Sequence, residues 1–128
     1  MGRGPGDEGS EGGAGAFGVR RPLRFLAYKL GLDDKQVAEL ARVLDELKTE
    51  RAQAAVDDRR TLTDFADAIG AGESFDAAKA GAGGDRRVES ARRLRDAVVR
   101  ALQQIHAMLN PDQRARLAYL IRTGVLVV

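Results

Sequence analysis

The chain has 128 residues, a formal net charge of +2 and 5% aromatic residues, with neither Trp nor Cys. This length fits one small domain, and the abundance of Ala, Leu and Arg favours helices over a β-sandwich. Without Cys there is no disulfide, no thiolate nucleophile and no Cys-type zinc site. We predict a single all-α domain over residues 19–128, preceded by a disordered Gly-rich tail over residues 1–18.

No segment of the sequence has the pattern of an export signal or a membrane span. The apolar stretch 22–32 is interrupted by Arg24 and Lys29, whereas a signal peptide needs roughly 7 to 15 uninterrupted apolar residues. A membrane-spanning helix would need about 20 apolar residues in a row. We therefore expect no membrane span and no signal peptide in this chain, which as written would be cytoplasmic.

Two helices are predicted in the first half of the chain. The first covers residues 20–31, where leucines recur at helical spacing until Gly31 ends the pattern. The second runs from residue 33 to about residue 70. Its predicted apolar stripe is formed by Val37, Leu40, Leu44, Leu47, Leu62, Phe65 and Ile69. Between the two parts of this stripe the seven-residue steps fall on Arg51 and Asp58, so the predicted seam is partly polar.

Two further helices are predicted in the second half. The third runs from about residue 75 to residue 109, although its glycines within residues 80–84 weaken the first turns, since each Gly costs about 1 kcal/mol against Ala. Its predicted apolar stripe is formed by Val88, Ala91, Val98, Leu102, Ile105 and Leu109. The fourth helix covers roughly residues 111–123 and ends at Gly124.

One short pattern, leucine, a capping residue, two residues and glutamine, occurs twice: LDDKQ at 32–36 and LNPDQ at 109–113. The motif residues are Leu32, Asp33, Gln36, Leu109, Asn110 and Gln113. In each copy the Asp or Asn side chain can cap a helix, the Gln can reach back to the cap, and the Leu can pack against the core. A single capping box is how many helices begin, so one copy alone carries no functional meaning.

The placement of the two boxes resembles the Spy/CpxP superfamily of bacterial envelope-stress proteins, whose signature is a pair of Leu-Thr-x-x-Gln motifs. Asp33 and Asn110 stand where the family has Thr, and both are equivalent capping residues. The segment DDRRTLTDF at 57–65 resembles the acidic-Arg-Arg segment of the family. The segment SFDAAKA at 74–80 resembles the start of its long third helix. The resemblance covers about residues 22–123.

The resemblance implies a long helical hairpin with short flanking helices, whose two copies associate antiparallel into a homodimer. Long helices on a small protomer favour a dimer independently, because they bury little surface alone. Folding about residue 72 would bring Asp58 near Arg86 or Arg87. Family members usually carry an export signal or a membrane anchor and are typically periplasmic, so the compartment stays open.

The third predicted helix offers a candidate partner-binding face. An alternating ladder of opposite charges is formed by Arg86, Glu89, Arg93, Asp96 and Arg100, and it is predicted to be a solvated face. Arg87, Arg92 and Arg95 instead flank the apolar side of the helix, together with Val99. Such a mixed apolar and cationic face suits the binding of unfolded chains. A dimer interface could use the same residues.

The sequence offers little for catalysis or metal binding. It has one histidine, no thiol and no phosphate-binding loop between a strand and a helix, so we predict no active site, no cofactor and no enzyme. Some relatives of the family, of the CnrX and ZraP types, are metal-responsive. Here only His106 and Met108 are available, two residues apart and therefore on different helix faces, so we predict no metal site.

We therefore predict an ATP-independent chaperone or a stress-response adaptor that binds unfolded or specific protein partners. A metal-responsive sensor is the first alternative. A nucleic-acid-binding helical protein is the second, although the acidic residues of the ladder cancel much of its positive field and no aromatic residue accompanies it.

Overall fold

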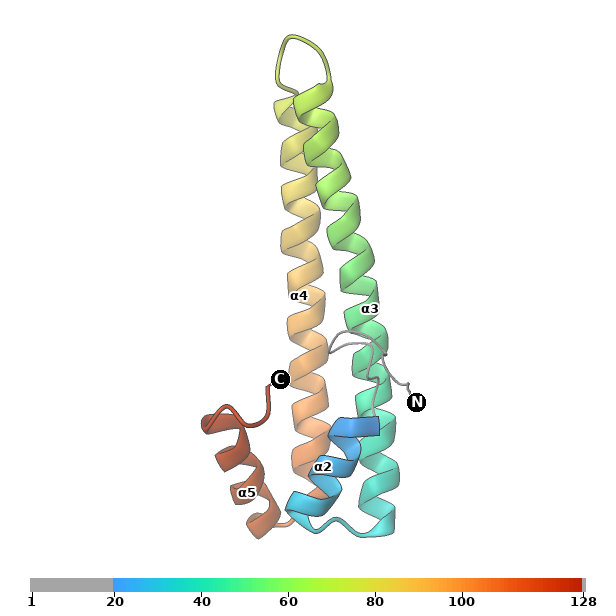
Figure 1. Ribbon diagram of the computed structural model, residues 1–128, viewed down its shortest axis with the longest axis vertical. Coiled ribbons are helices and arrows are strands. Elements are labelled where there is room, and N and C mark those ends of the chain that lie inside the picture. The colour runs from blue at the N-terminus through green and yellow to red at the C-terminus, as the bar shows by residue number, and fades with distance from the viewer. Residues whose placement is uncertain (1–19, 128) are drawn as a thin grey trace, which may run out of the picture. The chain divides into compact units, whose positions relative to one another are not determined.

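The computed structural model describes residues 20–127, and within this range every regular element is a helix. The helices are α2 (Arg20–Leu30), α3 (Asp34–Gly70), α4 (Ala77–Met108) and α5 (Pro111–Arg122) (Figure 1). The predicted all-α class and the hairpin of two long helices are confirmed. The predicted disordered tail at 1–18 lies outside the described residues.

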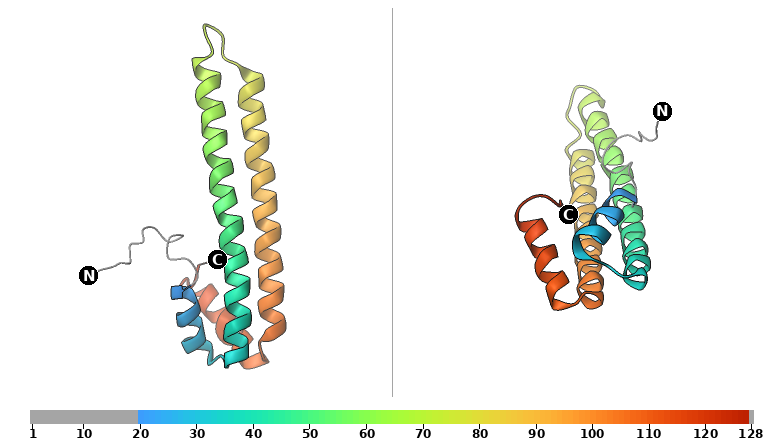
Figure 2. Two further views of the ribbon diagram at one scale, coloured as in Figure 1. Left: turned by 90° about the vertical axis from the view of Figure 1, so that its right-hand side faces the viewer. Right: turned by 60° about the horizontal axis from the view of Figure 1, so that its bottom comes forward.

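The chain divides into two compact units. Among the described residues, unit 1 consists of residues 20–48 and 98–127, and unit 2 consists of Thr49–Ala97. The long helices α3 and α4 contribute to both units, and they run antiparallel within each. Short helices α2 and α5 belong to unit 1, where they contact each other and lie on the same side of the α3/α4 pair (Figure 2). No helix within the described residues is long and apolar enough to cross a membrane.

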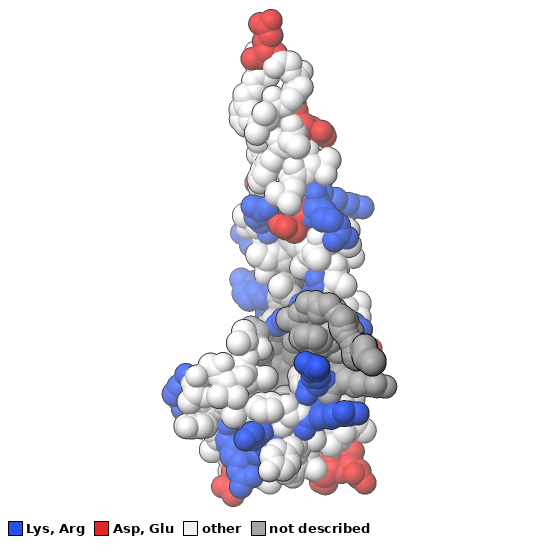
Figure 3. All heavy atoms as spheres, in the orientation of Figure 1, with Lys and Arg blue, Asp and Glu red and all other residues white. Residues whose placement is uncertain are grey.

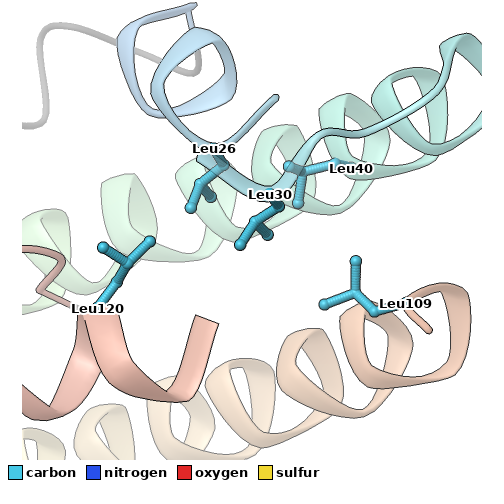
Figure 4. Packing of buried hydrophobic residues seen from close by; sticks show 5 residues of the cluster. All are labelled: Leu26, Leu30, Leu40, Leu109 and Leu120. Carbon is cyan, nitrogen blue, oxygen red and sulfur yellow. The ribbon is translucent and has the colours of Figure 1, made fainter. Parts of the chain in front are cut away.

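The hydrophobic core of unit 1 is built from leucines of α2, α3 and α5 and from Leu109, which directly follows α4. Leu26, Leu30, Leu40, Leu109 and Leu120 are buried together in it (Figure 4). Partly buried side chains surround them: Leu23, Phe25, Leu32, Leu44, Ile105, Met108, Leu117 and Leu126. Since burying a leucine fully contributes about 1.5–3 kcal/mol, this cluster is the main source of stability in unit 1.

Helix α2 ends where the sequence predicts. Its leucines recur at three and four residues, so they share the face that packs on the core. Gly31 then adopts the left-handed conformation, with φ of 63°. The N–H of Leu32 donates to the carbonyl of Ala27 at 3.0 Å, which satisfies a carbonyl that the end of the helix would otherwise leave unpaired.

Small and polar residues fill the seam between α3 and α4 in unit 2. The buried positions on α3 are Asp57, Thr61 and Ala68, and those on α4 are Gly83, Ser90 and Ala97. The α4 positions and the pair Thr61 and Ala68 follow a seven-residue repeat, as in a coiled coil. Side chains of this size allow two helix backbones to approach closely.

The predicted apolar stripes are wrong in unit 2. Leu62, Ile69 and Val88 are 52%, 74% and 51% exposed, and Ala91 is exposed as well. The buried positions on α3 lie one residue earlier, at Thr61 and Ala68, and one residue turns a helix by about 100°. The prediction assigned the largest apolar side chains to the seam, whereas the helices pair through their smallest ones and leave the large ones outside.

The two helices approach each other closely at Gly83. A Cβ atom at this position would lie 3.0 Å from the Cβ of Asp64 and 3.4 Å from the carbonyl oxygen of Thr61. The hydroxyl of Thr61 donates to the carbonyl of Gly83 at 3.2 Å, across the seam. The neighbouring Gly81 and Gly84 have nothing within 4 Å of such a Cβ. One glycine of the run is therefore required by packing.

Candidate functional site

Both copies of the leucine-glutamine motif form capping boxes in unit 1. At the start of α3, the N–H of Gln36 donates to the Asp33 carboxylate at 2.8 Å, and the N–H of Asp33 donates to the Gln36 side chain at 3.0 Å. At the start of α5, the reciprocal bonds between Asn110 and Gln113 have the same lengths. Pro111 occupies the first helical position, where a missing N–H costs nothing.

The two boxes meet through their glutamines. Gln36 donates from its side-chain amide to the Gln113 side-chain oxygen at 2.8 Å and to the carbonyl of Met108 at 2.9 Å. Gln113 donates to the carbonyls of Leu30 and Gly31, both at 3.3 Å. These carbonyls lie at the ends of α4 and α2, where intrahelical partners are missing. The glutamine pair therefore joins the ends of four helices.

The leucines of the motifs contribute to the same joint. Leu109 is buried in the core cluster of unit 1, and Leu32 packs against it. Gln113 is 6% exposed, so its amide is unavailable to a partner. The sequence predicts each cap from its own residues, but it carries no sign that the two glutamines bind each other, because they are far apart along the chain.

Ion pairs connect α3 and α4 in unit 2. Arg87 binds Asp58 at 3.0 Å, and Arg86 binds Asp64. Arg93 binds the buried Asp57 at 2.9 Å. The predicted proximity of Asp58 to Arg87 is thus observed.

Two details of the predicted charge pattern are wrong. The arginines Arg86 and Arg93 cross to carboxylates of α3, so the predicted ladder is not simply a solvated face. The seam charge is Asp57, while Arg51 and Asp58 are exposed, because the buried positions of α3 lie one residue earlier than the predicted ones.

Asp57 keeps its charge in the seam because polar groups surround it. Burial raises the pKa of this carboxyl, but hydrogen bonds from Gln53, Arg93 and Ser90, with the charge of Arg93, outweigh that effect and hold the pKa below its ordinary value. The Gln53 and Arg93 bonds measure 3.1 Å and 2.9 Å. Charged groups are normally excluded from a protein core, but a carboxylate that accepts several hydrogen bonds can stay ionised there.

A mixed face lies beside this seam on unit 2. The guanidinium of Arg87 lies 5.4 Å from the centre of the Phe65 ring while it binds Asp58. On α3, Leu62 and Ile69 lie three and four residues from Phe65, so all three share one side of the helix. We call Leu62, Phe65, Ile69 and Arg87 the apolar-cationic face.

The other predicted partner-binding residues also lie on α4. The side chains of Arg92 and Arg95 are more than half exposed, and they bind Glu89 at 3.5 Å and Asp96 at 2.9 Å. Val99 is exposed but belongs to unit 1. Sequence reasoning missed Leu62 and Val88 as surface residues because it placed both in the core.

No grouping of three or more His, Cys, Asp or Glu side chains suited to a metal ion occurs among the described residues. His106 is exposed near the end of α4, and its carbonyl accepts a hydrogen bond from the Arg114 side chain at 3.0 Å. This hydrogen bond therefore stabilises the turn between α4 and α5.

Comparison with protein families matches residues 19–120 to the LTXXQ motif family. The match includes both capping boxes and the whole hairpin of α3 and α4. Searches of curated proteins and of solved structures gave no significant match.

Proposed function

The chain belongs to the LTXXQ motif family, and from this premise we propose that it acts as an ATP-independent chaperone or a stress-response adaptor. Members of the family are generally non-enzymatic stress proteins of the Spy/CpxP type, which supports a binding role. The observation that carries the proposal is the apolar-cationic face of unit 2, where large apolar side chains lie in water beside arginines.

The chemistry of this face suits loose binding of unfolded chains. Leu62 and Ile69 offer apolar surface that a partner can cover, and each covered Å² contributes about 25 cal/mol. Arg87, Arg92 and Arg95 are each paired with a carboxylate, at Asp58, Glu89 and Asp96, and acidic segments of a client would compete for these guanidinium groups. Neither interaction requires a particular partner sequence. Because no single contact is strong, a client bound in this way can dissociate without ATP hydrolysis.

The same face could instead hold one dedicated protein partner, which is the meaning of the adaptor function. An adaptor would require shape complementarity to one folded surface, whereas a chaperone would bind many unfolded chains. The metal-responsive regulator stays an alternative that the same assay can distinguish.

We also propose that two copies associate as an antiparallel homodimer. Apolar side chains are also exposed outside the apolar-cationic face, among them Val99 and Leu102 on the part of α4 that belongs to unit 1, so a second copy would cover surface that one chain cannot. Light scattering at micromolar concentration should then give twice the chain mass. A folded monomer over the whole concentration range would contradict this part of the proposal.

The chaperone function is tested by suppression of client aggregation. The wild type should suppress aggregation of a thermally unfolding client without added metal. Changing Leu62 and Ile69 together to Ser should weaken suppression several-fold without unfolding the protein, because both side chains are exposed. Suppression only after addition of Zn²⁺ or Ni²⁺ would favour the metal-responsive alternative. No suppression of any generic client would favour the adaptor.

Two matched controls accompany this assay. Tyr28 and Tyr119 are exposed residues of unit 1, so their double change to Ser should leave suppression intact. For the charges, the triple change of Arg87, Arg92 and Arg95 to Gln should slow capture and flatten its salt dependence. Changing Arg51, Arg59 and Arg60 to Gln removes the same number of charges from exposed positions of α3 and should have a smaller effect.

A further inference from the structure

The two short helices of unit 1 carry a second cationic surface. Helix α2 contains four basic residues and no acidic residue, and α5 contains three basic residues and one acidic residue. Arg24 on α2 and Arg116 and Arg122 on α5 are exposed. Because the opposite face of each helix packs leucines into the core, the side chains of these three arginines are held on the outer face. This surface would attract a polyanion.

Each of these helices also exposes a tyrosine among its arginines. Tyr28 is 83% exposed and lies four residues after Arg24, while Tyr119 is 62% exposed and lies three residues from both Arg116 and Arg122. These spacings place each tyrosine on the same helix face as its arginines. We call Arg21, Arg24, Tyr28, Arg116, Tyr119 and Arg122 the α2–α5 surface.

The two helices that carry this surface lie side by side. Helices α2 and α5 lie against each other, and both lie on one side of the α3/α4 pair in unit 1 (Figure 2). Lys and Arg side chains gather over both helices on the face that Figure 3 shows. A flat, anionic partner could therefore contact both helices at once.

We infer that the α2–α5 surface docks the protein onto the headgroups of an anionic lipid bilayer, lying on the membrane without spanning it. Basic residues attract anionic headgroups, and tyrosine is the residue whose apolar ring and polar hydroxyl suit the boundary between lipid and water. Exposed aliphatic side chains lie near the end of this surface, with Ile121 in the last turn of α5 36% exposed and Val125 beyond α5 59% exposed. They could insert at the acyl boundary, as in interfacial amphipathic helices.

Two observations favour lipid over nucleic acid as the partner. The ammonium of Lys29 lies 5.8 Å from the centre of the Tyr28 ring, so one face of this ring is already occupied by a cation and is less open to a stacking base. The exposed Ile121 and Val125 side chains cannot hydrogen-bond to a phosphate backbone, whereas the acyl region of a bilayer can cover both.

The experiment is flotation of the full chain with lipid vesicles at low salt. The chain should bind vesicles of mixed phosphatidylglycerol and phosphatidylcholine, bind pure phosphatidylcholine weakly, and dissociate as salt rises. Changing Arg24 and Arg116 together to Gln should lower partitioning by about thirtyfold, since each basic residue near an anionic surface contributes roughly fivefold. Changing Tyr28 and Tyr119 to Ser should also weaken binding, but should preserve its salt dependence.

A matched pair controls for net charge. Changing Arg59 and Arg60 to Gln removes the same charge from exposed positions of unit 2 and should leave partitioning unchanged. Equal losses from both arginine pairs would show a net-charge effect and would overturn the inference, as would no binding to the anionic vesicles. Arg24-dependent binding of single-stranded DNA without vesicle binding would assign the surface to nucleic acid and would equally overturn it.

The inference is independent of the proposed chaperone function. The two surfaces lie in different units, so the Leu62 and Ile69 double variant should float with anionic vesicles like the wild type. Circular dichroism of every variant checks that the helices are retained, and Arg and Gln have similar helix propensity.

Discussion

Gln36 and Gln113 lie 77 residues apart in the chain, yet their side-chain amides bind each other at 2.8 Å. Each glutamine also completes the capping box of its own helix. One residue type at the third helical position therefore serves both the start of its helix and the contact between helices. This double use explains why both copies of the motif contain glutamine at the same place.

The glutamine pair predicts a selective loss of stability. Changing Gln113 to Ala should lower the free energy of unfolding by about 1 to 3 kcal/mol, because the Leu30 and Gly31 carbonyls and the Asn110 N–H lose a partner in a buried place. Urea unfolding measures the difference. Gln103, exposed on α4, is the control for the same change in helix propensity. Equal stability of the two variants would show that the pair contributes nothing.

The glycine run predicts opposite effects at neighbouring positions. Changing Gly84 to Ala should raise the free energy of unfolding by up to about 1 kcal/mol, since a Cβ there meets nothing within 4 Å. Changing Gly83 to Ala should lower it by about 1 kcal/mol, because the close contact with Asp64 outweighs the gain in propensity. Thermal unfolding measures whether the Gly84→Ala variant is more stable, and the Gly83→Ala variant less stable, than the wild type. Stabilisation by both changes would mean that the helices are less closely packed here.

These glycines show where prediction from sequence fails. Apolar periodicity predicts helices and their ends well, because caps such as Asp33 and stops such as Gly31 act locally. It does not predict which face pairs in unit 2. There the usual rule, large apolar residues inside, selects Leu62 and Ile69, while the helices pack through small and polar side chains.

The exposed residues of the candidate site could not be predicted from the sequence, for the same physical reason. The sequence predicts that Arg87 flanks the apolar side of its helix and that the neighbouring apolar residues Leu62 and Val88 lie in the core, whereas both are exposed. Only the geometry of α3 against α4 in unit 2 shows that the Arg87 guanidinium covers Phe65 and leaves Leu62 in water. The sequence does contain a usable signal: small residues recur every seven positions, at Gly83, Ser90 and Ala97, and Leu62 and Ile69 are also seven residues apart. A coiled-coil analysis could have used this pattern.

Asp57 predicts how the stability of the hairpin depends on pH. Its pKa is lowered in the folded state, so it stabilises the fold above its ordinary pKa, near 3.9, and this contribution is lost as pH falls through the lower folded value. The wild type should therefore lose stability more steeply below about pH 4 than a variant with Asp57 changed to Asn. Chemical unfolding across this range measures both slopes.

Asp58 provides the control for that comparison. It is an exposed carboxylate on the same helix turn, and its change to Asn removes an equal charge. The acid profile of this variant should stay close to that of the wild type. If the two Asn variants had the same profile, the donors around Asp57 would have no special effect.

Site-specific crosslinking to an unfolded client tests the proposed function most directly. Because the chain contains no cysteine, a single Cys at Ile69 can carry a benzophenone probe, and a single Cys at Tyr119 can carry the same probe in unit 1. Both positions are well exposed, at 74% and 62%. With a reduced and alkylated client that cannot refold, we predict strong crosslinking from position 69, weak crosslinking from position 119, and competition by excess unlabelled client. Equal yields from the two positions, or no client crosslinks from position 69, would contradict the assignment of the apolar-cationic face.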